Sequence, residues 1–214
     1  MSSIISTFIP EIIIGKNYND YMENIFPTLP VIADNKLSMI DQSIIHADEG
    51  GYWLEFGVHS GETITHTAGR KLGVPNLTIH GFDSFEGLPE DWLQPETGHT
   101  NLKGHFDLEG KIPQNLLCVH NINIIKGWFD KSLPKFIKEN DINKISFLNI
   151  DSDLYSSANT VLTLLTPYFK GHCVVYFDEF CNYPGGENGE YKAFSEFLHN
   201  NKDNIEKCIP IGIG

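Results

Sequence analysis

"FLNIDSDLYSS", residues 147–157, carries an apolar run into two aspartates, Asp151 and Asp153, that one residue separates. Strands in the middle of a parallel sheet are buried on both faces and have near-continuous apolar sequences. A carboxylate beside such a strand is costly to bury without a partner. We therefore interpret residues 144–151 as a buried strand whose end presents a pair of acids to a ligand or a cation. Taken singly, each acid is somewhat better explained as a solvated loop residue.

Apolar runs of the same kind alternate with helical patterns along the chain. We expect strands at residues 51–57, 77–83, 121–127, 144–151 and 172–180, and helices at 62–72, 133–139, 156–165 and 189–201. This alternation predicts an α/β fold with a mostly parallel sheet and helices on both faces. Residues 84–118 are rich in Gly, Pro and charge, and we expect mostly loop there with one short helix.

The segment before the sheet is less regular. We expect residues 1–45 to form an N-terminal helical or lid segment, with helices at 19–26 and 35–45, and residues 50–214 to form the core. A chain of 214 residues suits one domain with a sizeable core, so we expect a single domain over residues 1–214.

Composition narrows the classes of partner and compartment. The net charge of −13 argues against a nucleic acid or an anionic membrane as partner, because both require clustered Lys and Arg. Four cysteines without a CxxC spacing indicate reduced thiols and a cytoplasmic protein. The N-terminus lacks the basic region of a signal peptide, and no apolar run is long enough to span a membrane.

Acidic residues recur where the expected strands end. Ligands of open parallel sheets bind beyond the carboxyl ends of the strands, so these side chains should meet at one edge. A cluster of carboxylates there predicts a cation, a hydroxyl-rich ligand, or both. The acids in question are Glu55, Asp83, Asp130, Asp151, Asp153, Asp178 and Glu179.

The turn after the first core strand has the pattern ExGxxxG, formed by Glu55, Gly57 and Gly61. Glycines there let the backbone approach a ligand closely, and a helix would begin beside it. The pattern differs from the dinucleotide fingerprint GxGxxG. A purely structural strand-to-helix turn explains it nearly as well.

Several of these segments together resemble the macrocin O-methyltransferase family. They are, in chain order, "WLEFGVHSGETI", "GFDSFEGLPEDW", "IIKGWFDKSLP", "FLNIDSDLYSSANTVL" and "VVYFDEFCNYPGGENGEYKAF". The resemblance implies a Rossmann-like class I methyltransferase sheet that uses S-adenosylmethionine. It further implies methyl transfer to a hydroxyl, notably of sugars on natural products, with magnesium.

The resemblance also assigns roles to residues of this chain. It places Glu55 near the cofactor's amino group, Asp83 on its ribose, and Gly127 and Trp128 near its adenine. Asp151, Asp178 and Glu179 would hold the metal, and Asp153 would act as the base. The full set of cofactor-contacting residues that we predict is Glu55, Gly57, Val58, His59, Ser60, Gly61, Asp83, Ser84, Gly127, Trp128 and Asp151.

Two departures from the family pattern stand out. Characterised members carry two aspartates after the fifth strand, whereas this chain has Asp178 followed by Glu179, so Glu179 is the less certain ligand. The family sheet ends in a hairpin of two strands, but this chain stops about where the first of them should finish. The last strand is therefore either absent or supplied by another segment.

The chemistry of methyl transfer explains why paired acids would be needed. An aliphatic alcohol has a pKa near that of water, about 15.7, and must lose its proton as the new bond forms. A divalent cation can lower the pKa of the hydroxyl, and a nearby carboxylate such as Asp153 can take the proton. His59 is either a turn residue or a substrate contact, and it is the second candidate for the base.

Other functional classes stay open at this point. A nicotinamide oxidoreductase would need GxGxxG and a catalytic Tyr/Lys or His pair, which we cannot place. A non-catalytic relative that binds the cofactor or a partner protein is the other alternative. The apolar stretches "IISTFIPEIIIG" and "IPIGIG" near the chain ends suggest a homodimer, unless they pack on their own sheet.

Overall fold

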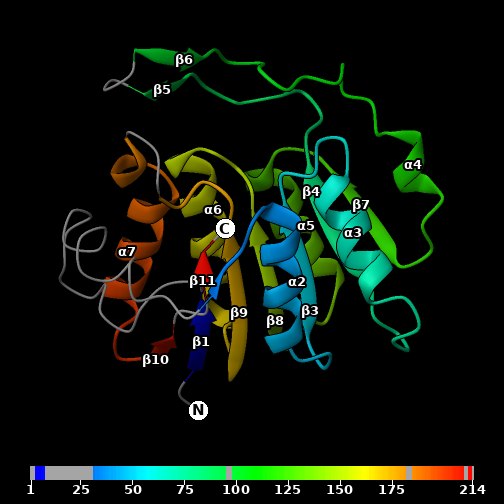
Figure 1. Ribbon diagram of the computed structural model, residues 1–214, viewed down its shortest axis with the longest axis vertical. Helices are drawn as coiled ribbons and strands as arrows, with labels where there is room; N and C mark the ends of the chain where they lie inside the picture. Colours follow the sequence, from blue (N-terminus) through cyan, green and yellow to red (C-terminus); the bar gives the residue numbers. More distant parts are fainter. Residues whose placement is uncertain (1–2, 8–30, 95–97, 182–184, 210–211, 214) are drawn as a thin grey trace.

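The computed structural model describes residues 3–7, 31–94, 98–181, 185–209 and 212–213. A seven-stranded sheet forms its centre, with the strand order β10-β1-β9-β8-β3-β4-β7 and every pair parallel (Figure 1). The strands are β1 (Ser3–Thr7), β3 (Tyr52–Phe56), β4 (Ile79–Asp83), β7 (Ile122–Lys126), β8 (Ile145–Ile150), β9 (His172–Phe177) and β10 (Ile205–Ile209). The predicted parallel α/β sheet is confirmed, and its five core strands lie where the apolar runs placed them.

Helices cover both faces of the sheet, as predicted. They are α2 (Lys36–His46), α3 (Glu62–Arg70), α4 (Gln114–Leu117), α5 (Phe129–Glu139), α6 (Tyr155–Leu165) and α7 (Glu190–Asn200), with short 3-10 turns at Thr166–Tyr168 and Gly186–Asn188. One apolar core contains side chains of α5, α6 and α7, and a second contains side chains of α2 and α3. Each core therefore joins one layer of helices to one face of the sheet.

β8 lies in the middle of this arrangement. All six of its residues are buried, and it pairs with β3 on one side and β9 on the other. Its neighbouring side chains point to opposite faces, so Phe147 packs in the α2/α3 core and Leu148 in the α5/α6/α7 core. The acids that follow β8 consequently emerge at the centre of the sheet's carboxyl edge.

The N-terminal strand β1 corrects the prediction of a helical segment over residues 1–45. It lies between β9 and β10, where Ile5 pairs with both Cys173 and Cys208. Pairing on both sides outweighs any local preference of a short apolar segment. The N-terminal segment thus supplies a strand beside β10. Of the two alternatives for the last strand of the family sheet, the structure shows that another segment of the chain takes its place. The helix expected at 35–45 is confirmed as α2, and the helix expected at 19–26 lies outside the described residues.

A hairpin of β5 (Trp92–Gln94) and β6 (His99–Asn101) interrupts the segment that was expected to be mostly loop. Each strand has three residues, too few to show an alternating pattern in the sequence. The hairpin lies above the carboxyl edge of the main sheet (Figure 1). The short helix expected in this segment is α4. β2 (Val31–Ile32) pairs with β11 (Gly212–Ile213) in a separate two-stranded sheet.

The apolar chain ends are partly used within the fold, because residues of both enter β1, β10 and β11. A single chain does not test the homodimer expected from them, which stays a prediction. No helix in the described part of the chain is long and apolar enough to cross a membrane.

Candidate active site

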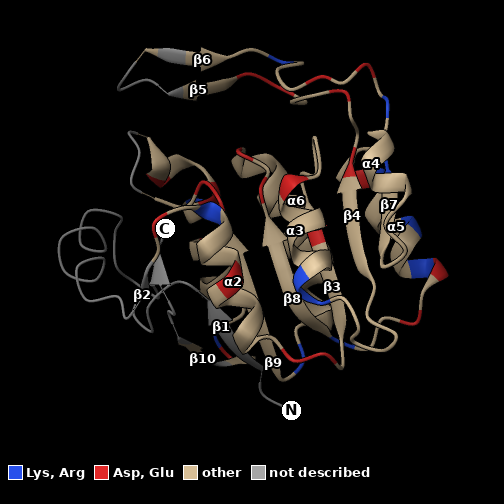
Figure 2. Ribbon diagram, turned by 45° about the vertical axis from the view of Figure 1, so that its right-hand side comes forward, with Lys and Arg blue, Asp and Glu red and all other residues tan. Residues whose placement is uncertain are grey.

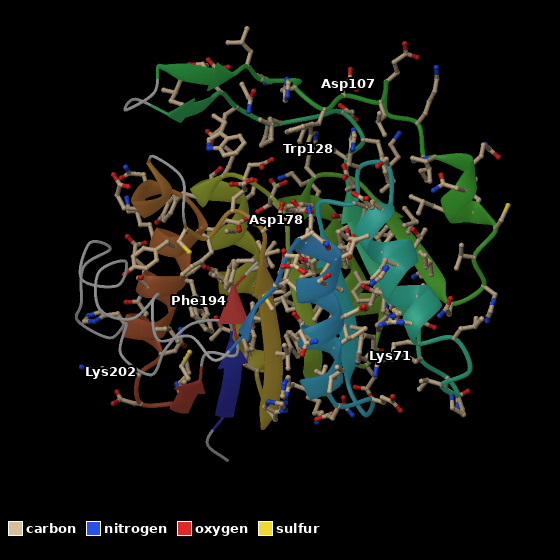
Figure 3. The ribbon with its side chains drawn as sticks, viewed as in Figure 1. Lys71, Asp107, Trp128, Asp178, Phe194 and Lys202 are labelled. Carbon is tan, nitrogen blue, oxygen red and sulfur yellow. The ribbon has the colours of Figure 1, made fainter. Side chains whose placement is uncertain are left out.

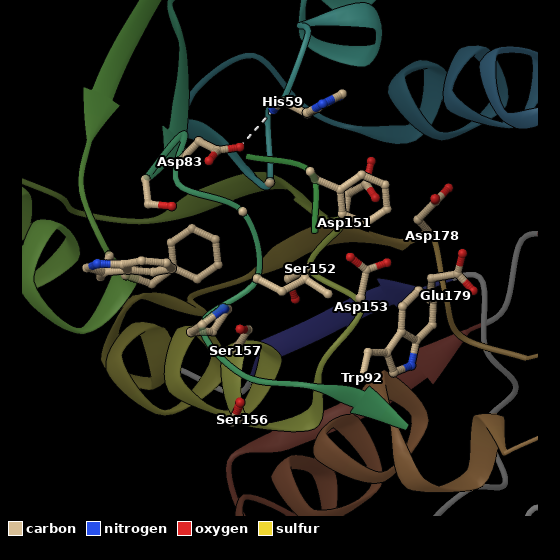
Figure 4. A pocket seen from close by; sticks show the side chains of 18 of the residues that line it. His59, Asp83, Trp92, Asp151, Ser152, Asp153, Ser156, Ser157, Asp178 and Glu179 are labelled. Atoms are coloured by element: carbon tan, nitrogen blue, oxygen red, sulfur yellow. Dashed lines mark hydrogen bonds between the residues drawn. The ribbon is translucent and has the colours of Figure 1, made fainter. Parts of the chain in front are cut away.

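A cavity of about 620 Å³ lies at the carboxyl edge of the sheet, beneath the β5–β6 hairpin (Figures 3 and 4). This volume is typical of a site for a small molecule. Acidic residues gather in the loops around it (Figure 2), and α2 begins at the basic residue Lys36. The acids that line it are Asp83, Asp130, Asp151, Asp153, Asp178 and Glu179, so the predicted convergence of strand-end carboxylates is present.

The loop after β8 places the first two acids. The amide of Asp151 donates to the carbonyl of Phe56 at 2.9 Å, which extends the pairing of β8 with β3 by one residue. Asp153 has a φ of 62°, in the left-handed region that non-glycine residues occupy at a cost. Burial, with repulsion from Asp178, raises the pKa of Asp153 to about 6. A carboxyl group tuned toward neutrality is suited to accept a proton.

The loop after β9 carries two further acids of the cavity, Asp178 and Glu179. The amide of Asp178 donates to the carbonyl of Ile150 at 3.0 Å, and the Tyr176 hydroxyl donates to Asp178 Oδ1 at 3.1 Å. Burial raises the pKa of Glu179 to about 7, and repulsion from Asp178 and Asp153 adds to the effect. About half of the Glu179 carboxyl groups are therefore protonated near pH 7.

Glu190, the first residue of α7, joins these two loops from behind. Its side chain is fully buried, and Oε1 accepts hydrogen bonds from the amide and hydroxyl of Ser152, at 3.0 and 3.3 Å. Oε2 accepts from the amide of Glu179 at 3.2 Å. This role of Glu190 is not predicted from the sequence, because an acid at a helix N-terminus is ordinarily explained by the helix dipole.

Lys36, the first residue of α2, was also missed. Its ammonium nitrogen lies 2.6 Å from Asp151 Oδ2 and 2.8 Å from Asp178 Oδ2, and its side chain lines the cavity. A signal was available, since a lysine in the first turn of a helix opposes the helix dipole and needs a compensating partner. None of the acids after β8 and β9 is close to Lys36 in sequence.

The pKa values of Lys36 and Asp151 are shifted by burial and by the charges around them. Burial alone would lower the pKa of Lys36, but attraction to Asp151 and Asp178 raises it above its ordinary value. For Asp151, burial and repulsion from Asp178 raise the pKa even though Lys36 lowers it. Both shifts show an excess of negative charge. One ammonium does not neutralise a cluster that also contains Asp153 and Glu179.

Glu55 lies beneath the first turn and not on the cavity wall. Its side chain is 1% exposed and accepts hydrogen bonds from the Thr63 hydroxyl at 2.6 Å and the Asn149 amide at 3.0 Å. Burial raises its pKa to about 7 in spite of these two donors. The carboxyl group thus supports the turn from within, and its contact with a cofactor stays a prediction.

The two glycines of the turn have a structural reason beyond ligand access. Gly57 and Gly61 have φ values of 89° and 87°, which favour glycine. A Cβ atom on Gly57 would lie 1.7 Å from the carbonyl oxygen of Asp151, and one on Gly61 would lie 2.2 Å from Leu116. The two glycines therefore first of all allow close contacts within the protein, with Asp151 and Leu116, in addition to any contact with a ligand.

Asp83 connects the end of β4 to the first turn. Its Oδ2 accepts from the amides of Val58 at 2.8 Å and His59 at 2.7 Å, and its Oδ1 accepts from the amide of Phe85 at 2.7 Å. A carboxylate offers about four acceptor positions, so Asp83 retains capacity for a ligand hydroxyl. The His59 ring is exposed and contacts the ring of Phe106, with centroids 5.7 Å apart.

The other predicted cofactor residues divide between the cavity and its support. Ser84 and Trp128 line the cavity, the latter from the N-terminus of α5. Ser60 accepts a hydrogen bond from Asn115 through its carbonyl, and the Gly127 amide donates to the carbonyl of Asp83 at 2.8 Å. Of the predicted set, the structure brings Gly57, His59, Asp83, Ser84, Trp128, Asp151, Asp153, Asp178 and Glu179 to the cavity wall. Glu55, Val58, Ser60, Gly61 and Gly127 are not among the residues that line it.

The hairpin and the loop before it form the roof. Leu88, Pro89 and Trp92 line the cavity from this side, and Figure 4 shows Trp92 together with the acidic residues. The hydroxyl of Ser156 in α6 donates to Glu90 at 2.5 Å, which ties the roof to the main body. The roof and the strand ends therefore enclose one site.

The expected metal ligands do not fit a divalent cation in this arrangement. The carboxylate oxygens are of the type that magnesium prefers, at ligand distances of about 2.1 Å. The ammonium of Lys36, however, already binds the oxygens of Asp151 and Asp178 that would have to hold the ion. In the part of the chain that the structure describes, no group of three or more His, Cys, Asp or Glu side chains is arranged to hold a metal.

Comparison with known proteins identifies the family. The family described as Macrocin-O-methyltransferase (TylF) matches residues 34–207. No curated protein matches this sequence significantly. Among solved structures, that of CalS11, a calicheamicin methyltransferase, is 25% identical and has a TM-score of 0.58, covering 77% of this chain and 71% of that one. The O-methyltransferase NovP, 21% identical with a TM-score of 0.55 over 80% of this chain and 76% of that one, shows the same fold.

The family match extends from just before α2 to β10, well over half of the chain, and it includes the loops that carry the acids of the cavity. The chain belongs to the macrocin O-methyltransferase family and is an O-methyltransferase.

Proposed function

We propose that this protein transfers a methyl group from S-adenosylmethionine to a hydroxyl group of a sugar or another small natural product. The observation that carries the proposal is one cavity that combines a retained acceptor position on Asp83 with a raised-pKa carboxyl group on Asp153. The family match and the likeness to a calicheamicin methyltransferase support this substrate class.

The residues at one end of the cavity fit the cofactor. Asp83 has room for one hydroxyl donor, as the ribose of a nucleoside would require, and the indole of Trp128 offers a flat apolar surface for a base. S-adenosylmethionine supplies an electrophilic methyl group on a sulfonium. The chain's part is to bind the nucleoside and exclude water from the reacting end.

Asp153 is the proposed base. The acceptor oxygen forms its bond to the methyl carbon as the carbon–sulfur bond breaks, and the electron pair of that bond stays on sulfur. The hydroxyl proton passes to the Asp153 carboxylate, so charge and atoms balance. With its pKa raised to about 6, Asp153 is mostly ionised near pH 7 and is a stronger base than an ordinary aspartate.

The acceptor side suits a hydroxylated ring. Trp92 and Phe106 provide aromatic faces, and Ser156 and Ser157 provide hydroxyl groups along α6. Aromatic side chains pack against the apolar faces of a sugar, while hydroxyl and carboxylate side chains bind its polar edge. Magnesium, which the family resemblance implied, is not part of this proposal because the Lys36 ammonium binds both Asp151 and Asp178, two of the residues that would hold the ion.

We also propose a cytoplasmic location. The structure describes all four cysteines and joins none of them by a disulfide bond. Cys173 is fully buried in β9, where burial raises the pKa of its thiol and makes it unreactive. Reduced thiols of this kind are typical of proteins in a reducing compartment.

Two measurements test the function. Calorimetry should detect binding of S-adenosylhomocysteine and no binding of NAD. A screen of hydroxylated acceptors with mass detection should find a product heavier by one methyl group. Binding of NAD instead of S-adenosylhomocysteine would contradict the proposal directly.

A further inference from the structure

We propose that the ammonium of Lys36 is the resident cation of the acidic site and takes the position that a divalent metal would need between Asp151 and Asp178. The inference rests on the proposed function and specifies how its site is charged. It predicts that this O-methyltransferase works without a divalent metal. It also predicts that Lys36 and a metal ion exclude each other.

The geometry is that of a shared ion pair. Lys36 Nζ lies 2.6 Å from Oδ2 of Asp151 and 2.8 Å from Oδ2 of Asp178. These are the distances of short, charge-assisted hydrogen bonds. The side chain of Lys36 is 32% exposed and those of the two aspartates are 20% and 19% exposed, so the group is partly shielded from solvent and faces the cavity.

The position of Lys36 is set by a packed helix. The side chain of Asn35 caps α2 by accepting from the amide of Ser38 at 3.0 Å. One turn further, Met39 and Ile40 are buried in the core that α2 shares with the sheet. The helix therefore delivers the lysine to the ends of β8 and β9 from a fixed starting point.

A cation at this end of α2 is unfavourable by itself, because the helix dipole places partial positive charge there. The two aspartates reverse that balance locally. Without Lys36, Asp151 and Asp178 would face each other with only Tyr176 donating to one of them among the described residues. The positive charge of Lys36 and the negative charges of the two aspartates thus compensate each other.

An ammonium has three N–H donors, and the two aspartates accept from two of them. The third can point into the cavity that Lys36 lines. There it can donate to the acceptor oxygen while the hydroxyl proton passes to Asp153. This hydrogen bond would stabilise the negative charge that develops on the oxygen, which is the role otherwise assigned to a metal.

Binding of manganese tests the proposal without requiring turnover. Calorimetry should show no saturable Mn²⁺ binding by the wild type at millimolar metal. Lys36→Ala frees the carboxylate pair and should bind Mn²⁺ at least about tenfold more tightly than the wild type. Lys36→Arg keeps the charge and should behave like the wild type. Lys144→Ala is the matched control, because it removes an ion pair to Asp48 of 2.7 Å outside the cavity wall, and it should not gain metal affinity.

The outcomes separate this inference from the proposed function. Wild-type Mn²⁺ binding as tight as that of Lys36→Ala would overturn the role of Lys36, whether or not an acceptor has been found. Once an acceptor is known, wild-type turnover should persist in EDTA, and loss of turnover that Mg²⁺ restores would also overturn it. If Lys36→Ala does not fold, the wild-type and Lys36→Arg titrations still decide the question. Failure to bind S-adenosylhomocysteine would count against the proposed function alone.

Discussion

The buried carboxyl group of Glu190 accepts a hydrogen bond from the backbone amide of Ser152, the residue between the two aspartates after β8. Its other oxygen accepts from the amide of Glu179 after β9. One side chain therefore spans the loops of two adjacent strands and sets how far apart their acids lie. Glu190 is a positioning residue, since it is behind the cavity wall and acts through the loops that it binds.

Glu190→Gln should lower turnover by about tenfold and destabilise the fold by about 1–3 kcal/mol. A carboxyl group accepts at both oxygens, whereas a carboxamide accepts at one only, so one of the two loop amides loses its partner. Thermal unfolding and steady-state kinetics would measure the two effects. Glu187→Gln, a change of the same kind on the adjacent 3-10 turn, is the control. Unchanged stability of Glu190→Gln would show that the bridge does not hold the loops.

Asp153→Asn should reduce turnover by about 10²–10⁴-fold, the usual contribution of a general base. Asparagine tolerates the left-handed backbone that Asp153 adopts, so the loop should keep its shape. The binding of S-adenosylhomocysteine should stay within about twofold of the wild type, and the stability should stay equal or rise because a buried charge is removed. Full turnover by this variant would move the base elsewhere, and His59 would then be the next residue to test.

Glu55 should make the stability fall as pH rises. Its pKa is raised to about 7 in the folded protein from an ordinary value near 4.5, so between these values the folded state binds more protons than the unfolded state. The free energy of unfolding therefore decreases between about pH 4.5 and 7, by up to about 3 kcal/mol from this group. Glu55→Gln should remove that part of the slope in urea unfolding measured at several pH values. A slope equal to that of the wild type would show that Glu55 titrates normally.

Trp92→Ala should weaken acceptor use without affecting the cofactor. The indole lines the cavity from the roof, and we expect kcat/KM for the acceptor to fall about tenfold, or about 1.4 kcal/mol. Calorimetry with S-adenosylhomocysteine should give the wild-type affinity. Trp92→Phe keeps an aromatic face and should retain most of the activity. A loss confined to cofactor binding would place Trp92 on the other side of the site.

The sequence by itself was sufficient for the core of the sheet. β3, β4, β7, β8 and β9 lie within the predicted runs, because a strand buried on both faces must be apolar along its whole length. Their order in the chain and the parallel rule then placed the acids after β4, β8 and β9 at one edge. The sequence therefore suffices to assign Asp151, Asp153, Asp178 and Glu179 to one edge of the sheet.

Only the tertiary structure decided what surrounds those acids. Lys36 is 115 residues from Asp151 and 142 from Asp178, and Glu190 is 38 residues from Ser152. β1 pairs with strands at the opposite end of the chain. Local periodicity reports which face of an element is buried, but not which distant element covers it. The charge that meets a strand-end carboxylate is therefore set by packing, and here packing brings an ammonium where the sequence suggested a metal.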